Sequence, residues 1–169
     1  MNLIKYVVIF TSFIFLVNCG ETEKKDDKKR VTIGASKEVK KEDSKTVTIG
    51  LTGNDMMQFN TKELKVKAGV EVTLTLRHTG KMDLKVMGHN FVLLKSGVEI
   101  PSFSLEAANA GGAEDWIPNN GKDVIAHTKM LGGGQSTSVT FTAPSAGTYD
   151  FICSFPGHSG IMKGKFIVE

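Results

Sequence analysis

The sequence has few cysteines, little net charge and no hydrophobic run of membrane-spanning length. Its formal net charge is +3, and Lys/Arg and Asp/Glu are equal in number within residues 46–169. This balance predicts no basic surface of the kind that binds a phosphate backbone, so we exclude nucleic acid as a partner. The apolar run of residues 6–17 has 12 residues, whereas a spanning helix needs about 20.

Residues 1–18 have the pattern of a bacterial lipoprotein signal peptide. Lys5 precedes the short apolar run, and residues 16–19 (LVNC) resemble a lipobox in which Cys19 becomes the acylated first residue. Asn18 departs from the small residue usual at that position. The alternatives are an ordinary cleaved signal and an uncleaved anchor. Each of them places the protein outside the cytoplasm, in the periplasm or cell envelope, and lipidation would anchor it to a membrane.

Residues 19–45 differ sharply in composition from the rest of the chain. Residues 21–45 are highly charged, contain no aromatic residue and have few apolar ones. Such a segment cannot bury enough surface to fold by itself, so we interpret residues 19–45 as a charged flexible tether. The folded domain is predicted to occupy residues 46–169.

Alternating apolar residues in residues 46–169 predict an all-β sandwich. In VEVTLTLRHTG, the apolar residues recur at every second position, and TSVTFTA repeats the pattern before a turn. The residues on these two apolar faces are Val70, Val72, Leu74 and Leu76, and then Val139 and Phe141. Residues 104–110 (SLEAANA) instead favour one short helix outside the sandwich, with Ser104 as its N-cap.

Three residue types near the C-terminus suggest a metal site. Cys153, His158 and Met162 offer a thiolate, an imidazole and a thioether within ten residues, around a Phe-Pro-Gly turn. This soft donor set, with one more imidazole, is what a blue-copper site requires. His89, at the start of a short apolar strand, is the candidate for the second imidazole, and Asn90 could hydrogen-bond to the backbone near Cys153.

Each of these residues alone has a simpler structural explanation. A lone cysteine or methionine is usually part of a core, and a lone histidine is often structural. The full ligand set at this spacing makes those explanations unconvincing together. If Cys19 carries lipid, Cys153 also lacks a disulfide partner, and a bound metal would protect its thiol from oxidation. Zinc is the main rival metal, but a thioether is a poor ligand for it.

Because of these motifs and the strings given next, residues 46–169 resemble the azurin branch of the blue-copper (cupredoxin) family. The matching strings are GNDMMQFNT (53–61), VMGHN (86–90), VIAHTK (124–129), SVTF (138–141) and CSFPGHSGIMKG (153–164). The resemblance implies a Greek-key sandwich that holds one copper ion cycling between Cu(I) and Cu(II). It implies His89, Cys153 and His158 as the strong ligands, Met162 as the weak axial ligand, and the Gly88 carbonyl on the opposite side.

The resemblance also implies roles for residues around the ligands. Asn90 would act as a clamp between loops, with Ser154 and Phe155 beside the ligands. His158 would present its outer edge to solvent within an apolar electron-transfer patch. The residues that match this patch are Met57, Met82, Met87, Pro156 and Gly157.

Several positions depart from the family pattern or fall outside the site. Neither Val47 nor Gly69 is cysteine, so the usual disulfide has no counterpart, and Phe91 stands where a buried tryptophan is common. The single tryptophan, Trp116, lies between the helix and the next strand. His78 is expected to pack beside the core and His127 to lie on the surface. Neither histidine is a candidate ligand.

The predicted function is type 1 copper electron transfer between redox partners. Natural partners would be c-type cytochromes and terminal reductases or oxidases in the cell envelope. The alternative is copper storage or delivery in the periplasm. We do not expect an enzyme, because Cys153 and His158 have no identifiable orienting acid and the spare histidines lie in unrelated segments.

Overall fold

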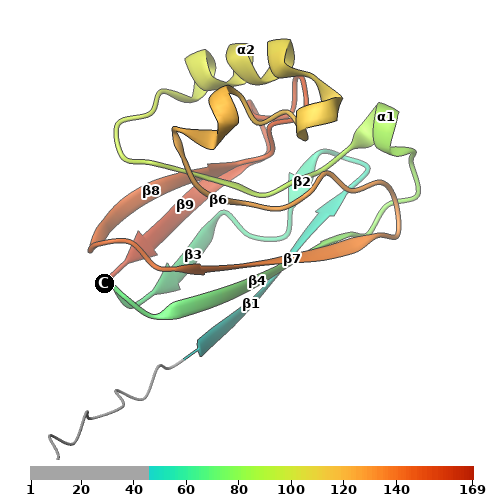
Figure 1. Ribbon diagram of the computed structural model, residues 1–169. Helices are drawn as coiled ribbons and strands as arrows, with labels where there is room; N and C mark the ends of the chain where they lie inside the picture. The colour runs from blue at the N-terminus through green and yellow to red at the C-terminus, as the bar shows by residue number, and fades with distance from the viewer. Residues whose placement is uncertain (1–45) are drawn as a thin grey trace, which may run out of the picture. The chain divides into compact units, whose positions relative to one another are not determined.

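Two β-sheets packed face to face form the body of the protein (Figure 1). The computed structural model describes residues 46–169. The predicted signal peptide and tether, including Cys19, lie outside the described residues and stay predictions. Within residues 46–169 no helix is both long enough and apolar enough to cross a membrane.

The first sheet contains four strands. Their order across the sheet is β2 (Gln58–Phe59), β1 (Thr46–Asn54), β4 (Glu71–His78) and β7 (Ser136–Thr142). β1 and β4 run parallel, whereas the other neighbours are antiparallel. Val72, Leu74 and Leu76 of β4 are fully buried, as their alternation predicts. Val70 precedes the first residue of β4 and is only partly buried.

The second sheet contains five strands and carries the metal-site loop. Their order is β3 (Glu63–Val66), β9 (Lys163–Val168), β8 (Gly147–Ile152), β5 (Val92–Leu94) and β6 (Val124–His127). Only the pair β3 and β9 is parallel. Since β8 and β9 are antiparallel neighbours, the residues between them form one loop at the end of the sheet.

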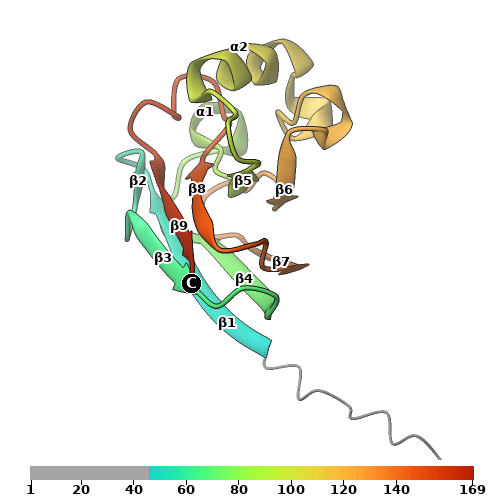
Figure 2. The ribbon, with the colours of Figure 1, turned by 90° about the vertical axis from the view of Figure 1, so that its left-hand side faces the viewer.

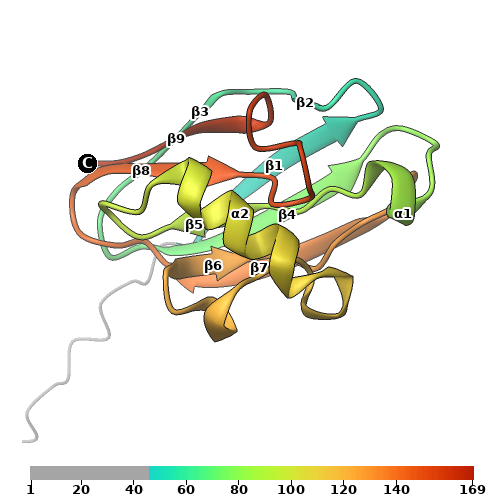
Figure 3. The ribbon, with the colours of Figure 1, turned by 90° about the horizontal axis from the view of Figure 1, so that it is seen from above.

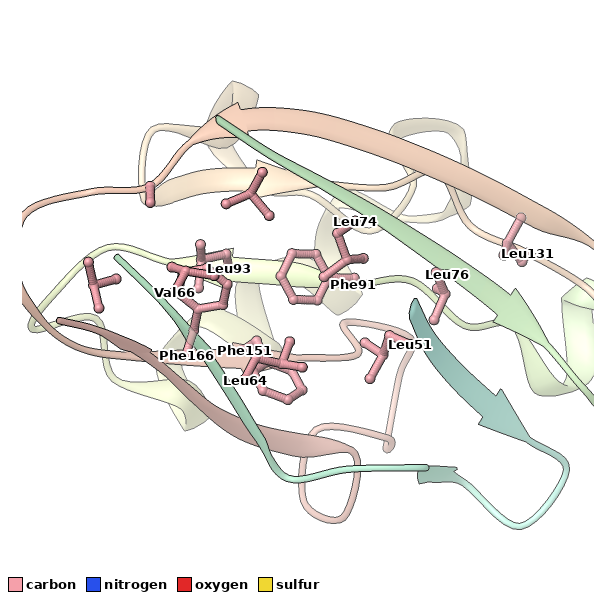
Figure 4. Close-up of a cluster of buried hydrophobic side chains, with 13 residues drawn as sticks. Leu51, Leu64, Val66, Leu74, Leu76, Phe91, Leu93, Leu131, Phe151 and Phe166 are labelled. Carbon is pink, nitrogen blue, oxygen red and sulfur yellow. The ribbon is translucent and has the colours of Figure 1, made fainter. Parts of the chain in front are cut away.

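A large apolar cluster fills the space between the sheets (Figure 4). Inward-facing residues of both sheets interdigitate there, as expected for a sandwich. Its members are Leu51, Leu64, Val66, Val72, Leu74, Leu76, Phe91, Leu93, Leu131, Ala143, Phe151, Phe166 and Val168. Phe91 is fully buried within this cluster.

The helix expected outside the sandwich is present but starts earlier than predicted. α2 spans Ile100–Ala110, so the prediction of Ser104 as N-cap is wrong. Pro101 lies in the first turn, where proline needs no hydrogen-bond partner. Ser104 instead lies inside the helix and donates its hydroxyl to the Ile100 carbonyl oxygen at 2.8 Å.

α2 covers the outer face of the second sheet (Figures 2 and 3). Phe103 and Ala107 of the helix are buried in a smaller apolar cluster that also contains residues of β5, β6 and β8. Two 3₁₀ turns follow α2, at Gly112–Glu114 and Asn119–Gly121. The helix and its following segment therefore form a third layer over one end of the sandwich.

A second, very short helix was not predicted. α1 spans Leu84–Met87, and the preceding Asp83 is its N-cap, whose side chain accepts a hydrogen bond from the Lys85 N–H at 2.9 Å. It lies between β4 and β5, at the same end of the sandwich as the last residue of β1, Asn54. Thr46, where the described chain begins, lies at the other end of β1 (Figure 1).

Candidate metal centre

The loop between β8 and β9 brings three predicted ligands together. Cys153 directly follows β8, and its N–H donates to the Met162 carbonyl oxygen at 2.9 Å, which closes the loop. The His158 N–H donates to the Phe155 carbonyl at 3.0 Å, while the His158 carbonyl accepts from the Met162 N–H at 2.8 Å. Gly157 has a φ of 83°, which glycine adopts without strain. This turn folds His158 and Met162 back beside Cys153, as predicted.

The second imidazole comes from the segment between α1 and β5. His89 forms an antiparallel bridge with Leu131, with N–H to carbonyl distances of 3.0 and 2.8 Å in the two directions. This bridge ties the backbone of His89 to Leu131, which lies in the segment between β6 and β7. The structure joins His89 to Cys153, which is 64 positions away in sequence.

The strong donor atoms lie at separations that suit one shared ion. Cys153 Sγ is 3.6 Å from His158 Nδ1 and 4.0 Å from His89 Nδ1, and the three donors lie within 4.8 Å of one another. Two ligands bound at about 2.0 and 2.3 Å, as nitrogen and sulfur bind zinc, would be about 3.7 Å apart at a trigonal angle. The observed separations bracket that value.

The hydrogen bonds of His89 leave one donor atom directed at the centre of the site. Its Nε2 lies 2.8 Å from the Asn54 carbonyl oxygen, and its Nδ1 lies 2.8 Å from the Gly88 carbonyl oxygen. A neutral imidazole carries only one N–H, so it can donate to only one of these oxygens. With Nε2–H donating to Asn54, the Nδ1 lone pair and the Gly88 oxygen face each other with no proton between them, and a cation bound by Nδ1 would offset their repulsion.

Burial favours the neutral forms of the three donors when no metal is bound. It lowers the pKa of His89, and it lowers the pKa of His158 to about 4, with nearby His89 and His78 as smaller causes. Burial also raises the pKa of the Cys153 thiol to about 12. Both imidazoles therefore keep free lone pairs at neutral pH, whereas a thiolate needs a positive charge beside it. A bound metal cation supplies that charge.

Met162 and Gly88 lie next to these donors. Met162 is fully buried, and a Cβ placed on Gly53 would lie 3.2 Å from Met162 Cε and 2.8 Å from His89 Cδ2. The end of the Met162 side chain therefore lies beside the His89 ring. The Gly88 carbonyl oxygen lies 3.7 Å from Cys153 Sγ, so it is also next to the donor atoms.

Asn90 connects the two ligand-bearing segments. Its Oδ1 accepts from the Ser154 N–H at 2.8 Å, and its Nδ2 donates to Ser154 Oγ at 2.8 Å. Nδ2 also donates to the Asp115 carbonyl oxygen at 3.0 Å. The structure thus contains the predicted hydrogen bond from Asn90 to the backbone next to Cys153.

Comparison with known proteins places this site in a family. A profile of copper binding proteins, the plastocyanin/azurin family, matches residues 45–169. The chain belongs to this family. Azurin of Alcaligenes faecalis is 44% identical over 118 residues, which cover 68% of this chain and 91% of the relative. Azurin-2 of Alcaligenes xylosoxydans xylosoxydans is 45% identical over 115 residues, covering 66% and 88%.

Solved structures of blue-copper proteins share the fold of this member of the plastocyanin/azurin family. Auracyanin A, a "blue" copper protein of Chloroflexus aurantiacus, matches with a TM-score of 0.68 and 34% identity over 74% of this chain and 100% of the other. An azurin of Methylomonas sp. strain J matches with a TM-score of 0.66 and 34% identity over 73% and 98%. The predicted all-β sandwich and the predicted copper cofactor are confirmed. So is the prediction of a blue-copper electron-transfer protein.

Some residues of this plastocyanin/azurin-type site were not identified from the sequence. Gly53 packs against His89 and Met162, and the Asn54 carbonyl accepts from the His89 ring. A glycine inside a strand is itself a signal of close approach, so Gly53 could have been found. Asp115 and Trp116, which contact Asn90 and Phe155, had no such signal.

The two histidines set aside as ligands have different environments. His78 is fully buried and stacks on His89 with ring centroids 4.2 Å apart. Its Nδ1 accepts from the Gly80 N–H at 3.0 Å, so its Nε2–H donates to the Met87 carbonyl at 2.8 Å. Both ring nitrogens are therefore hydrogen-bonded, and the buried ring packs in the interior as expected. His127 is exposed, as predicted.

The residues of the expected electron-transfer patch differ in exposure. Met82, Pro156 and Gly157 are exposed, whereas Met57 and Met87 are half-buried. The most exposed methionine of the described residues is Met56, which the sequence comparison did not select. Three further apolar side chains are exposed near these segments or on α2, namely Val86, Ile161 and Leu105.

Proposed function

We propose that His89, Cys153 and His158 bind one copper ion as strong ligands in a type 1 site. Met162 would be the weak axial ligand, with the Gly88 carbonyl as a distant oxygen. The bound copper would supply the chemistry, a one-electron change between Cu(II) and Cu(I). The chain's own contribution is to hold soft and borderline donors that suit both oxidation states.

The observation that carries this proposal is the closed, prearranged donor group. His89, Cys153 and Met162 are fully buried, and His158 retains 3% exposure. Backbone hydrogen bonds and the Asn90 bridge hold these residues on a stiff sandwich, so little has to move when the charge of the site changes. A small rearrangement favours rapid electron transfer, and the absence of an exposed donor among these four residues leaves no obvious position for a substrate.

Among the ligands, His158 is the proposed route for the electron. It alone among the four keeps contact with solvent, and the exposed residues Pro156 and Gly157 lie beside it in the chain. Together with Met82 they would form an apolar surface for brief docking, to which Met57 and Met87 contribute their half-buried side chains. Redox proteins such as c-type cytochromes and terminal reductases or oxidases would be the partners.

The cellular location follows from the N-terminal prediction. We propose that the protein works in the periplasm or cell envelope, attached to a membrane through lipidated Cys19 and the tether of residues 19–45. In that arrangement the domain would exchange electrons with membrane-bound partners and would itself catalyse no reaction.

Copper loading tests the proposed function. Addition of Cu(II) should produce one intense visible absorption band that arises from charge transfer from the Cys153 thiolate to Cu(II). The band should disappear on reduction, because Cu(I) cannot accept this charge. Cys153→Ser should abolish the band while far-UV circular dichroism stays unchanged. Cys19→Ser is the matched control and should leave the band intact.

The same sample distinguishes electron transfer from copper delivery. A delivery protein should release its copper rapidly to a competing chelator and cycle poorly with redox dyes. A colourless Cu(II)-loaded protein, or rapid release with no reversible redox cycle, would contradict the proposal of electron transfer.

A further inference from the structure

Two neighbouring residues after α2 have an unusual backbone conformation. Asp115 has a φ of 51° and Trp116 has a φ of 55°. Side chains other than glycine rarely adopt this left-handed region, and for a bulky residue such as tryptophan it is a genuine outlier. Such conformations persist where surrounding contacts determine them, and they concentrate near functional sites. The contacts of these two residues lead to the metal centre.

Asp115 contacts the segment of His89 directly and the segment of Cys153 only through Asn90. Its carbonyl oxygen accepts from Asn90 Nδ2 at 3.0 Å, and its carboxylate Oδ1 accepts from the Met130 N–H at 3.0 Å. Asn90 in turn is hydrogen-bonded to Ser154, the neighbour of Cys153. Met130 lies against Gly88, where a Cβ would be 3.0 Å from Met130 Cγ.

Trp116 begins a row of three rings that ends at a proposed ligand. Its ring centroid lies 4.9 Å from that of Phe155, at an angle of 51°. The Phe155 ring lies 4.6 Å from the His158 ring, at an angle of 42°. On the other side, a Cβ on Gly112 would lie 2.9 Å from Trp116 Cη2, so the indole is closely confined. These are distances at which aromatic rings attract each other.

We propose that Trp116 is a positioning residue for the copper centre, acting through Phe155 on His158, with Asp115 holding the segment in place. The segment 115–116 belongs to the layer outside the sandwich, so it forms a third support for the site beside the two sheets. This inference rests on the proposed function, because the property that it assigns to Trp116 is control of the copper site.

The direction of the effect follows from solvent access. Trp116 packs on Phe155, and Phe155 packs on one side of the His158 ring, so these apolar rings limit the access of water to that side. Less access of water to the site disfavours the more highly charged Cu(II) state. Removal of the indole would admit water, stabilise Cu(II) and lower the reduction potential. It would also loosen the loop between β8 and β9 even without metal.

The test uses two measurements on the full protein. The first is amide hydrogen exchange at Ser154 in the metal-free protein, and the second is the reduction potential of the copper-loaded protein. Trp116→Ala should speed exchange at Ser154 about tenfold, which corresponds to a loss of about 1.4 kcal/mol in the free energy of local opening. It should also lower the reduction potential. Trp116→Phe should restore both values close to those of the unmodified protein because it keeps a ring against Phe155.

Leu105→Ala is the matched control. Leu105 is an exposed apolar residue on α2, 67% exposed, and no ring contact joins it to the site. It should leave both measurements unchanged. If Trp116→Ala does not fold, Trp116→Leu replaces it. Leucine supplies part of the apolar volume but no ring against Phe155, so this variant should show the faster exchange at Ser154 and a smaller shift in potential.

The outcomes separate this inference from the proposed function. Unchanged Ser154 exchange in the Ala or Leu variant would overturn the positioning role, as would Trp116→Phe behaving like Trp116→Ala. A shift in potential without faster exchange would also overturn it. If the unmodified protein forms no blue-copper centre, the proposed function fails, while exchange in the metal-free protein still decides whether Trp116 positions the loop.

Discussion

The apolar core and the metal end of this sandwich are equally buried but built from different chemistry. Between the sheets, leucine, valine and phenylalanine side chains fill space without directional contacts. At the metal end, His78, His89, Asn90 and Ser154 are also buried, yet each has specific hydrogen-bond partners. In the described part of the chain, every buried side-chain nitrogen or oxygen lies within hydrogen-bonding distance of another polar group.

This contrast separates the two tasks of the fold. A core of apolar side chains tolerates changes that conserve volume, because burial is not directional. A buried polar site tolerates few changes, because each lost partner leaves another group unsatisfied. Substitutions in the core should therefore change stability and spare the copper properties. Substitutions at the metal end should alter the copper properties at a lower cost in stability.

The largest loss of stability is expected at the centre of the core. Phe166 is fully buried, so Phe166→Ala should lower the free energy of unfolding by about 3–5 kcal/mol through lost burial and a cavity. Urea unfolding of the metal-free protein measures this. Phe141→Ala, at a partly buried position, should cost less. A large shift in reduction potential for Phe166→Ala would contradict the expectation that core substitutions change stability and spare the copper properties.

A smaller loss is expected at the bridge between the ligand segments. Asn90→Ala removes the acceptor of the buried Ser154 N–H and should cost about 1–3 kcal/mol. It should also slow electron self-exchange, because the loop of Cys153 would rearrange more than in the unmodified protein when the copper changes its oxidation state. Thermal unfolding of the metal-free protein and self-exchange of the copper form measure the two effects. Asn109→Ala, at an exposed position of α2, should change neither. An Asn90 variant with wild-type self-exchange would contradict the bridge.

The proposed axial ligand allows a test that nearly conserves volume. Met162→Leu should cost less than about 1.5 kcal/mol, since the two side chains are similar in size. It should raise the reduction potential, because an apolar methyl replaces a weak sulfur donor to Cu(II). Cyclic voltammetry measures the shift. Met130→Leu, a buried methionine next to Gly88, is the control and should shift the potential less. Equal shifts would argue against Met162 as a ligand.

The smallest effect is expected at a carboxylate on the rim of the metal end. The Lys81 N–H donates to Asp55 at 2.8 Å, and this hydrogen bond is the main cause that lowers the pKa of Asp55, with Met82 adding to it. A lowered pKa in the folded state stabilises the protein above the ordinary value of 3.8, and this contribution is lost as pH falls through the folded pKa. Asp55→Asn should therefore be less stable than the unmodified protein at pH 7, and the difference should shrink near pH 3. Urea midpoints at the two pH values measure it, and a difference that grows toward acid would contradict this sign.

The sequence predicts which donor side chains come together because their combination is rare. A cysteine, a histidine and a methionine around a Pro-Gly turn have few other uses in combination, and His89 stands at a recognisable strand start. The start of α2 was misplaced because Pro101 and Ile100 are compatible with a first turn as well as with a loop. Asp115 and Trp116 could not be found, because their roles depend on a left-handed backbone and on contacts across the fold. Local propensity does not encode either.

The position of Thr46 has a practical consequence. β1 extends from Thr46 to Asn54, whose carbonyl bonds the His89 ring, so roughly 26 Å of strand separates the junction with residue 45 from the donor group. Thr46 is therefore a point of attachment at the opposite end of β1 from the donor group. Coupling the domain to an electrode through residue 46 should keep the proposed copper site away from the electrode surface.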